Sequence, residues 1–423
     1  MQGTQGGSGG SGGGNGEKPG RPVRFAARTG WDLSENRLAA VLAEARAAGR
    51  RLVDLTEGNP TRAGLAGVDV APLLAALGHP RGARYEPVAL GHPEARAAVA
   101  RYYAERGLAI DPARIVLGAS TSEAYGWLLK LLTERGDEVL VPAPSYPLLE
   151  YLACLEDVAL TPYPLLREEG WRIDLGALDR AASERERARA VVLVHPNNPT
   201  GSFARRDEAA ALEALAAERG LALIVDEVFG DYAHGALPPD RLPSFAGRDG
   251  ALTFVLSGLS KVMALPQLKL GWIVVSGPEE LAAAAMQRLE VIADTYLSVS
   301  TPVQLALPEI LAARGPVQKA ILARVQQNLA ALDAALAALA ALAGQSGAAV
   351  RRLPVDGGWY AILEVPRFHD EDGWVELLVR EEGVVVHPGY FFDMPRDGFL
   401  VVSLLPDPAA FADAVARALA RLA

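Results

Sequence analysis

Lys261 is the residue whose position suggests chemistry most directly. It follows the apolar run TFVL and the short loop 257–260. A lysine at the end of a buried strand loses hydration, and this lowers the pKa of its amine because the charged form is disfavoured. A neutral amine is a nucleophile that forms imines with carbonyl compounds. An isolated loop lysine is more commonly a solvated residue, so the interpretation depends on the neighbouring loops.

Three further segments supply complementary polar groups. Asp226 closes the run LALIVD, where a carboxylate either caps the next segment or pairs with a buried cation such as a protonated pyridine nitrogen. Asn198 lies in the proline-rich turn HPNNPTG, where the fixed backbone aims an amide donor. Ser120, Thr121 and Ser122 precede a predicted helix, where they are either ordinary caps or a phosphate site at the helix N-terminus.

Together with the aromatic ring of Tyr146, these groups suit a phosphorylated pyridine aldehyde. The elements that must position them are short apolar runs that alternate with helical stretches such as 208–219. The runs are Ile115–Leu117, Glu138–Val141, Val191–Val194, Leu223–Val225, Thr253–Leu256 and Trp272–Val275. This alternation predicts an α/β fold with a mostly parallel sheet sandwiched by helices. In such sheets the ligand binds beyond the carboxyl ends of the strands.

The chain of 423 residues is long enough for two domains. Residues 1–30 are rich in Gly and Ser and predict a disordered tail. We expect a large cofactor-binding domain over 76–304 and a smaller α+β domain built from both chain ends, 31–75 and 305–423. Helices are predicted over 33–50 and over 302–342, the latter broken near Gly315.

Composition excludes several classes of protein. The net charge of −10 disfavours a nucleic-acid partner. A single cysteine, Cys154, and six scattered histidines predict neither a disulfide nor a metal site. The longest apolar run, 334–343, is far shorter than the roughly 20 residues that a bilayer requires, and the N-terminus lacks the apolar core of a signal peptide. We therefore expect a cytoplasmic protein with no membrane partner.

The segments HPNNPTG, DEVFGDY and SGLSKVMALPQLKLGW resemble, in order and spacing, the class I/II aminotransferases of the fold-type I pyridoxal-phosphate enzymes. The resemblance runs from about residue 31 to the C-terminus. It implies an enzyme that moves an amino group between an amino acid and a 2-oxo acid by a ping-pong mechanism. Lys261 would form an imine with pyridoxal 5′-phosphate and shuttle the proton. Asp226 would pair with the pyridine nitrogen, and Asn198 would bind the phenolic oxygen.

The same resemblance implies roles for the remaining site residues. Tyr146 would stack on the cofactor ring. The phosphate would be held by Ser120, Thr121, Ser122, Ser260 and Lys269. Tyr85, in YEPVALG, resembles the tyrosine that reaches the phosphate of a neighbouring subunit, which implies a homodimer with shared active sites. The segment 296–304 is expected to face that partner as well.

Three residues depart from the pattern of the family. Phe229 replaces a tyrosine that donates to the phenolic oxygen, so we predict a raised imine pKa. Lys269 replaces the phosphate-binding arginine and keeps its charge but not its planar fork. Val401 replaces the arginine that binds the substrate α-carboxylate. Arg62, in the turn that begins at Gly58, is the predicted substitute.

The missing carboxylate arginine leaves other reactions of the same cofactor open, namely those of a β-lyase, a decarboxylase or a racemase. A non-catalytic, cofactor-sensing regulator is a further alternative. Such a regulator would require a DNA-binding module ahead of the domain, and only about 30 residues, 11 of them glycine, precede it here. Aminotransferase activity is therefore the leading interpretation.

Overall fold

The structure is a computed structural model that describes residues 23–33, 37–65, 69–343 and 349–423. Contacts divide the chain into two units, residues 1–33 and residues 34–423. In the first unit, the described residues contain one short 3-10 turn, η1 (Ala27–Thr29), followed by a hydrogen bond from Gly30 N to Ala27 O of 3.0 Å. Most of the predicted tail, residues 1–22, lies outside the described residues. All further description concerns the second unit.

The second unit contains an eight-stranded sheet in the order β2-β9-β8-β7-β6-β3-β4-β5. The strands are β2 (Ile115–Gly118), β3 (Glu138–Ala143), β4 (Ala159–Leu166), β5 (Arg172–Ile173), β6 (Ala188–Val194), β7 (Ala222–Asp226), β8 (Thr253–Gly258) and β9 (Gly271–Ser276). Four strand pairs are parallel, whereas β9 is antiparallel to both of its neighbours and β5 is antiparallel to β4. The predicted mostly parallel sheet is confirmed. Strand β4 was not predicted, because its two prolines disfavour a strand.

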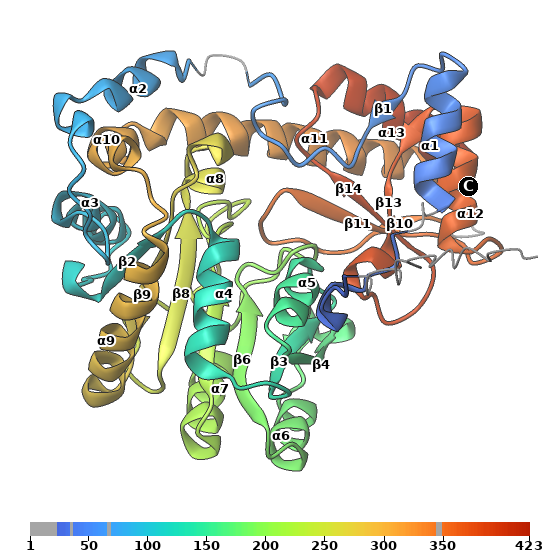
Figure 1. Cartoon of the computed structure of the whole chain (residues 1–423). Coiled ribbons are helices and arrows are strands. Elements are labelled where there is room, and N and C mark those ends of the chain that lie inside the picture. The colour runs from blue at the N-terminus through green and yellow to red at the C-terminus, as the bar shows by residue number, and fades with distance from the viewer. Residues whose placement is uncertain (1–22, 34–36, 66–68, 344–348) are drawn as a thin grey trace, which may run out of the picture. The chain divides into compact units, whose positions relative to one another are not determined.

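Both faces of this sheet are buried, as the continuous apolar runs predict. In β7, Ala222 and Ile224 pack into one hydrophobic cluster, and Leu223 and Val225 pack into another. The first cluster includes residues of the helices α4 (Thr121–Leu132), α5 (Leu148–Leu155) and α9 (Glu279–Tyr296), and Figure 1 shows α4 and α5 in front of the sheet. The second includes residues of α3 (Pro93–Ala104), α6 (Leu175–Glu184) and α7 (Arg206–Arg219).

Two smaller sheets lie outside this one. The first has the order β10 (Arg351–Arg352), β11 (Tyr360–Glu364), β14 (Phe399–Ser403), β13 (His387–Pro388), and all its pairs are antiparallel. In the second, β1 (Val53–Asp54) pairs in parallel with β12 (Val384–Val385). Residues from the two halves of the chain therefore share a sheet. This supports a small domain built from both chain ends, although its exact boundaries stay a prediction.

The remaining helices are α1 (Arg37–Ala47), α2 (Ala71–Ala75), α8 (Leu259–Val262), α10 (Thr301–Ala312), α11 (Arg314–Ala343), α12 (Glu371–Leu377) and α13 (Pro408–Leu422). The predicted long helix is divided at Ala313, two residues before Gly315, as expected. Pro316 lies in the first turn of α11, where no intrahelical donor is required of it. None of the helices in the described part of the chain has the length and apolarity needed to cross a membrane.

Candidate active site

Loops that follow three neighbouring strands meet at the carboxyl end of the large sheet. Asp226, the last residue of β7, lies in register with Val194 on β6 and with Leu256 on β8. Strand β6 continues into the turn that contains Asn198, and β8 continues into α8, which contains Lys261. The parallel register therefore places the carboxylate between the two segments that hold the amide and the amine.

Lys261 lies in a largely apolar environment. Its Nζ atom is 5.2 Å from the ring centre of Trp359 and 5.6 Å from that of Phe229. Burial lowers the pKa of the Lys261 amine, and the nearby Asp226 carboxylate opposes this shift in part. The amine is thus shifted toward the neutral, nucleophilic form, as expected for a lysine at the end of a buried strand.

Asp226 is a buried carboxylate with two hydrogen-bond donors. Its Oδ1 accepts from Val228 N at 3.0 Å, and its Oδ2 accepts from the Tyr125 hydroxyl at 3.3 Å. Burial raises the pKa of Asp226 to about 6, although these hydrogen bonds and the Lys261 ammonium act in the opposite direction. A buried carboxylate with this raised pKa favours a cationic partner, and a protonated pyridine nitrogen would meet that need.

The two asparagines of HPNNPTG have different surroundings. Asn197 is used within its own turn, because its Oδ1 accepts from the Thr200 hydroxyl at 2.9 Å and its Nδ2 donates to Pro144 O. Asn198 is 7% exposed, and its Oδ1 is buried with no hydrogen-bond partner among the described residues. Buried polar atoms are nearly always paired, so an unpaired one suits a bound ligand. Asn198 is therefore the asparagine available to a cofactor.

The start of α4 offers unpaired donors. Ser120 caps the helix, and its Oγ accepts from Glu123 N at 3.1 Å. Within the described part of the chain, the main-chain N–H groups of Thr121 and Ser122 have no partner. These groups lie at the positive end of a helix of 12 residues, which attracts anions. A phosphate group would fit at this position.

Three glycines lie side by side beneath this helix start. Gly118 on β2 pairs with Gly271 on β9, which pairs in turn with Gly258 on β8. A Cβ atom on Gly271 would lie 3.1 Å from the main chain of Ser120, and one on Gly258 would lie 2.9 Å from Gly271 Cα. Only glycine allows these close approaches, so the row brings the start of α4 against the strands that lead to Lys261.

Two serines precede Lys261 and a second lysine follows it. Ser260, the predicted phosphate ligand, lies in α8 and is partly exposed. Ser257 was not selected from the sequence, yet its Oγ is buried and has no partner among the described residues. Lys269 is exposed, and its φ of 52° lies in the left-handed region two residues before Gly271. Its ammonium is therefore free to approach an anion at the start of α4.

The residues around Phe229 show how the substitution at this position is accommodated. The Phe229 ring packs edge-on against Trp359 at 5.2 Å between ring centres. Tyr232, three residues further along the chain, directs its hydroxyl to the main-chain oxygen of Lys261 at 2.5 Å. Tyr232 therefore fixes the backbone of the reactive lysine.

The sequence analysis missed the segment Gly357–Tyr360, which joins the small sheet to the site. A Cβ atom on Gly201, in the HPNNPTG turn, would lie 2.3 Å from Gly357 O, and Gly358 N donates to Tyr232 O at 2.9 Å. The indole of Trp359, which packs against Lys261, is fully buried, and its Nε1 has no partner within the described ranges. The doublet Gly-Gly before two aromatic residues was the available sequence signal for this close approach.

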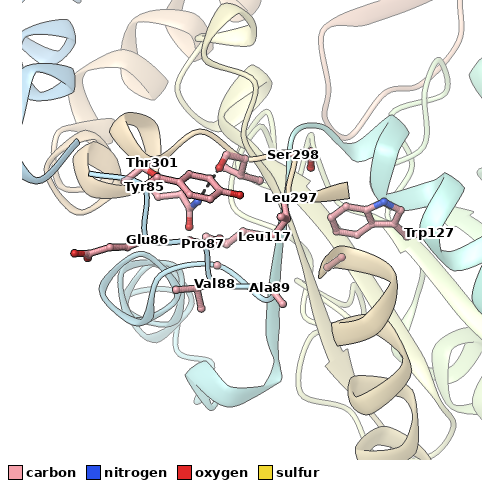
Figure 2. Close-up of a pocket in the computed structure, with 14 residues that line it drawn as sticks. Tyr85, Glu86, Pro87, Val88, Ala89, Leu117, Trp127, Leu297, Ser298 and Thr301 are labelled. Carbon is pink, nitrogen blue, oxygen red and sulfur yellow. Dashed lines mark hydrogen bonds between the residues drawn. The ribbon is translucent and has the colours of Figure 1, made fainter. Parts of the chain in front are cut away.

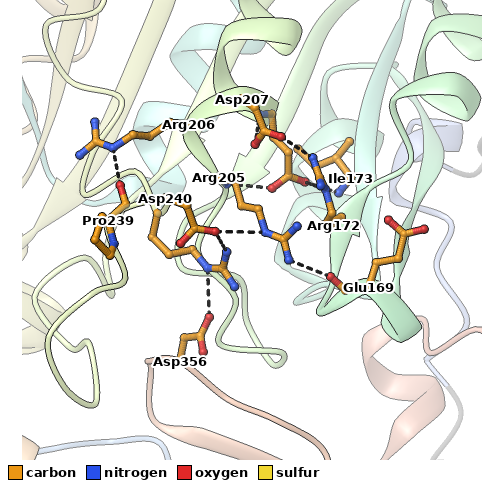
Figure 3. Close-up of polar contacts among 11 residues, drawn as sticks. Glu169, Arg172, Ile173, Arg205, Arg206, Asp207, Pro239, Asp240 and Asp356 are labelled. Atoms are coloured by element: carbon orange, nitrogen blue, oxygen red, sulfur yellow. Dashed lines mark hydrogen bonds and ion pairs between the residues drawn. The ribbon is translucent and has the colours of Figure 1, made fainter.

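A group of charged residues supports the same segment. Asp356 lies next to Gly357, and its Oδ2 is 3.4 Å from Arg241 Nε. Arg241 also pairs with Asp240, which in turn pairs with Arg205 at the start of α7 (Figure 3). Through these ion pairs, most of which lie at the surface, the loop before α7 is connected to the loop that contains Asp356, next to the small sheet.

Tyr85 and the segment 296–304 line one hollow, which Figure 2 shows. The Tyr85 side chain is largely exposed, and Leu297, Ser298 and Thr301 are among its neighbours in the hollow. Ser298 donates through its hydroxyl to Glu123 Oε2 at 2.7 Å, and Glu123 belongs to the first turn of α4. The two segments that were expected to face a partner subunit are therefore adjacent, next to the helix of the phosphate site.

The other predicted residues lie as follows. Tyr146 follows β3 and is partly exposed, with its ring centre 6.3 Å from that of Phe392. Arg62 is well exposed, and its Nε lies 3.3 Å from Glu57 Oε2. Val401, the residue in place of an arginine, is fully buried in β14. The role of Arg62 as the substitute for that arginine stays a prediction.

The sheet order and the meeting of these groups define a cofactor-binding α/β fold of the fold-type I class. The chain belongs to the aminotransferase class I and II family, whose sequence profile matches residues 51–417. It is a pyridoxal-phosphate-dependent aminotransferase, and the family resemblance predicted from the three motifs is confirmed.

Individual relatives support this assignment. Alanine aminotransferase of Mycobacterium tuberculosis is 28% identical over 389 residues, which cover 89% of this chain and 86% of that protein. Glutamate-pyruvate aminotransferase AlaA of Haemophilus influenzae is 25% identical, with 84% and 87% covered. Among solved structures, alanine aminotransferase from Pyrococcus furiosus superposes with a TM-score of 0.80 at 22% identity and covers 94% of this chain and 99% of its own. The fold is thus shared along nearly the whole chain.

Proposed function

We propose that transamination takes place at Lys261 and that the site residues have the roles predicted from the sequence. The observation that carries this proposal is geometric: the register of β6, β7 and β8 places the buried Asp226 carboxylate between the segments that contain Asn198 and Lys261, whose amine lies 5.2 Å from the Trp359 ring centre. Asp226 would bind the pyridine nitrogen, Asn198 the phenolic oxygen, and Tyr146 the ring face. The phosphate would be bound by Ser120, Thr121, Ser122, Ser260 and Lys269, and we add Ser257 to this group.

When bound, pyridoxal 5′-phosphate supplies an aldehyde that accepts an amino group and a ring that withdraws electrons. Lys261 takes the proton from the α-carbon of the amino acid as a general base and returns a proton as a general acid. The rings of Phe229 and Trp359 exclude water around the amine, which keeps it reactive. Tyr232 holds the Lys261 backbone so that the amine keeps its position during both transfers.

The substrates are an amino acid and a 2-oxo acid, and we propose alanine as the first amino donor to test, with 2-oxoglutarate as acceptor. Support comes from two relatives that cover 89% and 84% of this chain, which are named alanine aminotransferase and glutamate-pyruvate aminotransferase. The two half-reactions share one site, so we expect ping-pong kinetics.

We further propose that two chains form a homodimer with shared active sites. The adjacency of Tyr85 and the segment 296–304 in one hollow supports this arrangement, because both were predicted to face a partner. An exposed tyrosine in this hollow would reach the phosphate of the second subunit. The expected cytoplasmic location stays a prediction.

Borohydride reduction of the purified holoprotein tests the role of Lys261. The reduction fixes the cofactor on the lysine that holds it, and peptide masses then locate the modified residue. We expect the mass increment on the peptide that contains Lys261. An unmodified Lys261 or a modified Lys269 would refute the assignment.

A second measurement separates transamination from the rival reactions. Alanine added without a 2-oxo acid should release one pyruvate per site and no ammonia. Serine should not give continuous release of pyruvate and ammonia, which would be the result for a β-lyase.

A further inference from the structure

The substrate carboxylate requires a binding group that is not the arginine typical of the family. Val401, at that position, lies opposite Ile362 on β11 and opposite His387 on β13. Burial lowers the pKa of His387 below its ordinary value, so this ring is neutral at neutral pH. His387 also stacks on Phe391 at 5.2 Å between ring centres. The two residues that lie opposite Val401 on the adjacent strands therefore supply no positive charge at neutral pH.

The face of the small sheet that contains Val401 is directed at the turn that begins at Gly58. Side chains of alternate residues share a face, and residues opposite each other in a pair do so as well. Tyr360 is opposite Ser403, so Tyr360, Ser403 and Val401 lie on one face. Ser403 donates through its hydroxyl to Glu57 O at 2.7 Å, which places this face against the residue before Gly58.

The Tyr360 hydroxyl is the polar group that this face directs at the turn. A Cβ atom on Gly58 would lie 2.3 Å from the Tyr360 Oη atom, so the phenol contacts the glycine directly. Among the described residues, neither the Tyr360 hydroxyl nor Gly58 N has a hydrogen-bond partner. Burial, together with Tyr146 and Glu57, raises the pKa of Tyr360 well above its usual range, so the phenol stays protonated and can donate.

In the chain, Tyr360 directly follows a residue that packs against the reacting amine. The preceding residue, Trp359, packs its ring 5.2 Å from Lys261 Nζ. The segment 359–360 therefore contacts the amine through Trp359 and the Gly58 turn through the Tyr360 hydroxyl.

We propose that the Tyr360 hydroxyl, beside Gly58 N, binds the α-carboxylate of the substrate in place of the family's arginine. This inference depends on the proposed site at Lys261. It makes Tyr360 a specificity-determining residue, because a neutral hydroxyl donates to a carboxylate but does not provide the charge of a guanidinium. The rival is Arg62, whose guanidinium would have to leave Glu57 to reach a substrate.

The test compares the best amino acid of the wild-type holoenzyme with its carboxamide, which lacks the negative charge. The readout is the rate of single-turnover conversion of the bound cofactor over a range of substrate concentrations. We expect Tyr360→Phe to lower kcat/KM for the amino acid by about tenfold to a hundredfold, mainly through KM, since a hydrogen bond to a charged group is lost. Conversion of the carboxamide should fall by a clearly smaller factor, because its neutral carbonyl oxygen accepts a weaker hydrogen bond from the same hydroxyl.

Tyr390→Phe is the matched control. It removes a hydroxyl in the same part of the chain that donates to Asp372 Oδ1 at 2.8 Å, and both substrates should react as with the wild type. Equal losses for the acid and the amide in Tyr360→Phe would overturn the proposal, because they indicate a purely structural role. A selective loss of the acid in Arg62→Ala but not in Tyr360→Phe would overturn it in favour of Arg62. Failure of the wild type with every amino acid would instead refute the proposed function.

Discussion

The two sides of the active site are built in different ways. The proposed cofactor side consists of Asp226, Asn198 and Lys261, each of which lies at the end of its own strand or within four residues after it, on three neighbouring parallel strands. The proposed substrate side brings residue 58 together with residues 360 and 403, which lie about 300 or more positions later in the chain, through contacts such as that of Ser403 with Glu57 O. On the first side these three residues match the pattern of the family, although Phe229 and Lys269 nearby depart from it, whereas the second side lacks the family's carboxylate arginine at Val401.

The difference indicates which side can change between related enzymes. A residue at the end of a parallel strand is held by the register of the sheet, and a substitution there removes the chemistry itself. A residue on the small sheet such as Tyr360 reaches the Gly58 turn through its side chain, so a different donor can take its place without altering the fold. Substitutions that affect one side at a time test this difference.

Lys261→Ala should produce the largest effect. Removal of the amine eliminates both proton transfers, so we expect kcat to fall by about 10⁴-fold. Borohydride should no longer fix the cofactor, and thermal unfolding should stay close to that of the wild type because the lysine side chain makes no hydrogen bond within the described residues. Retention of roughly a tenth of the activity would show that another group performs the transfer.

Asp226→Asn should affect activity and stability in opposite directions. We expect kcat to fall about a hundredfold or more, because the charge that pairs with the pyridine nitrogen is lost. The raised pKa of about 6 favours the protonated form in the folded chain. Stability from this group is therefore fully present below the ordinary value of 3.8 and is lost as the pH rises through about 6.

The cofactor-free Asp226→Asn variant should consequently be the more stable protein near neutral pH, by up to roughly 3 kcal/mol. The advantage should vanish as the pH approaches the ordinary carboxyl range. Thermal unfolding of both cofactor-free proteins across this range of pH measures it. A variant that is less stable at neutral pH would show that the Asp226 carboxylate stabilises the empty site.

Phe229→Tyr should produce the smallest change. A phenol at this position adds a donor for the phenolic oxygen of the cofactor, so the pH-dependent absorbance change of the holoprotein should move down by about one pH unit. Activity should change little. An unmoved titration would mean that the new hydroxyl points elsewhere, for example toward Trp359, which the present ring contacts.

The sequence alone predicted the residues of the cofactor side, because each lies close in the chain to a strand that the sequence also predicts. Six apolar runs predicted six strands, and the loops after three of them contain the residues that meet. The sequence did not reveal Tyr125, Ser257 or Tyr360, since their importance depends on contacts across elements. Tyr125, for instance, reaches Asp226 from a helix 101 positions earlier in the chain. Burial and unpaired atoms identify such residues, and neither is visible in a one-dimensional pattern.

The row formed by Gly118, Gly271 and Gly258 has a consequence for the size of the ligand. Helix α4 follows β2 and Lys261 follows β8, with only β9 between them. Neighbouring strands are about 4.8 Å apart, so the anion-binding helix start and the loop with the amine are separated by two such steps, roughly 10 Å. The spacing of hydrogen-bonded strands therefore sets the distance that a ligand needs between its charged end and its reactive carbon. This distance does not depend on which amino acid is the substrate.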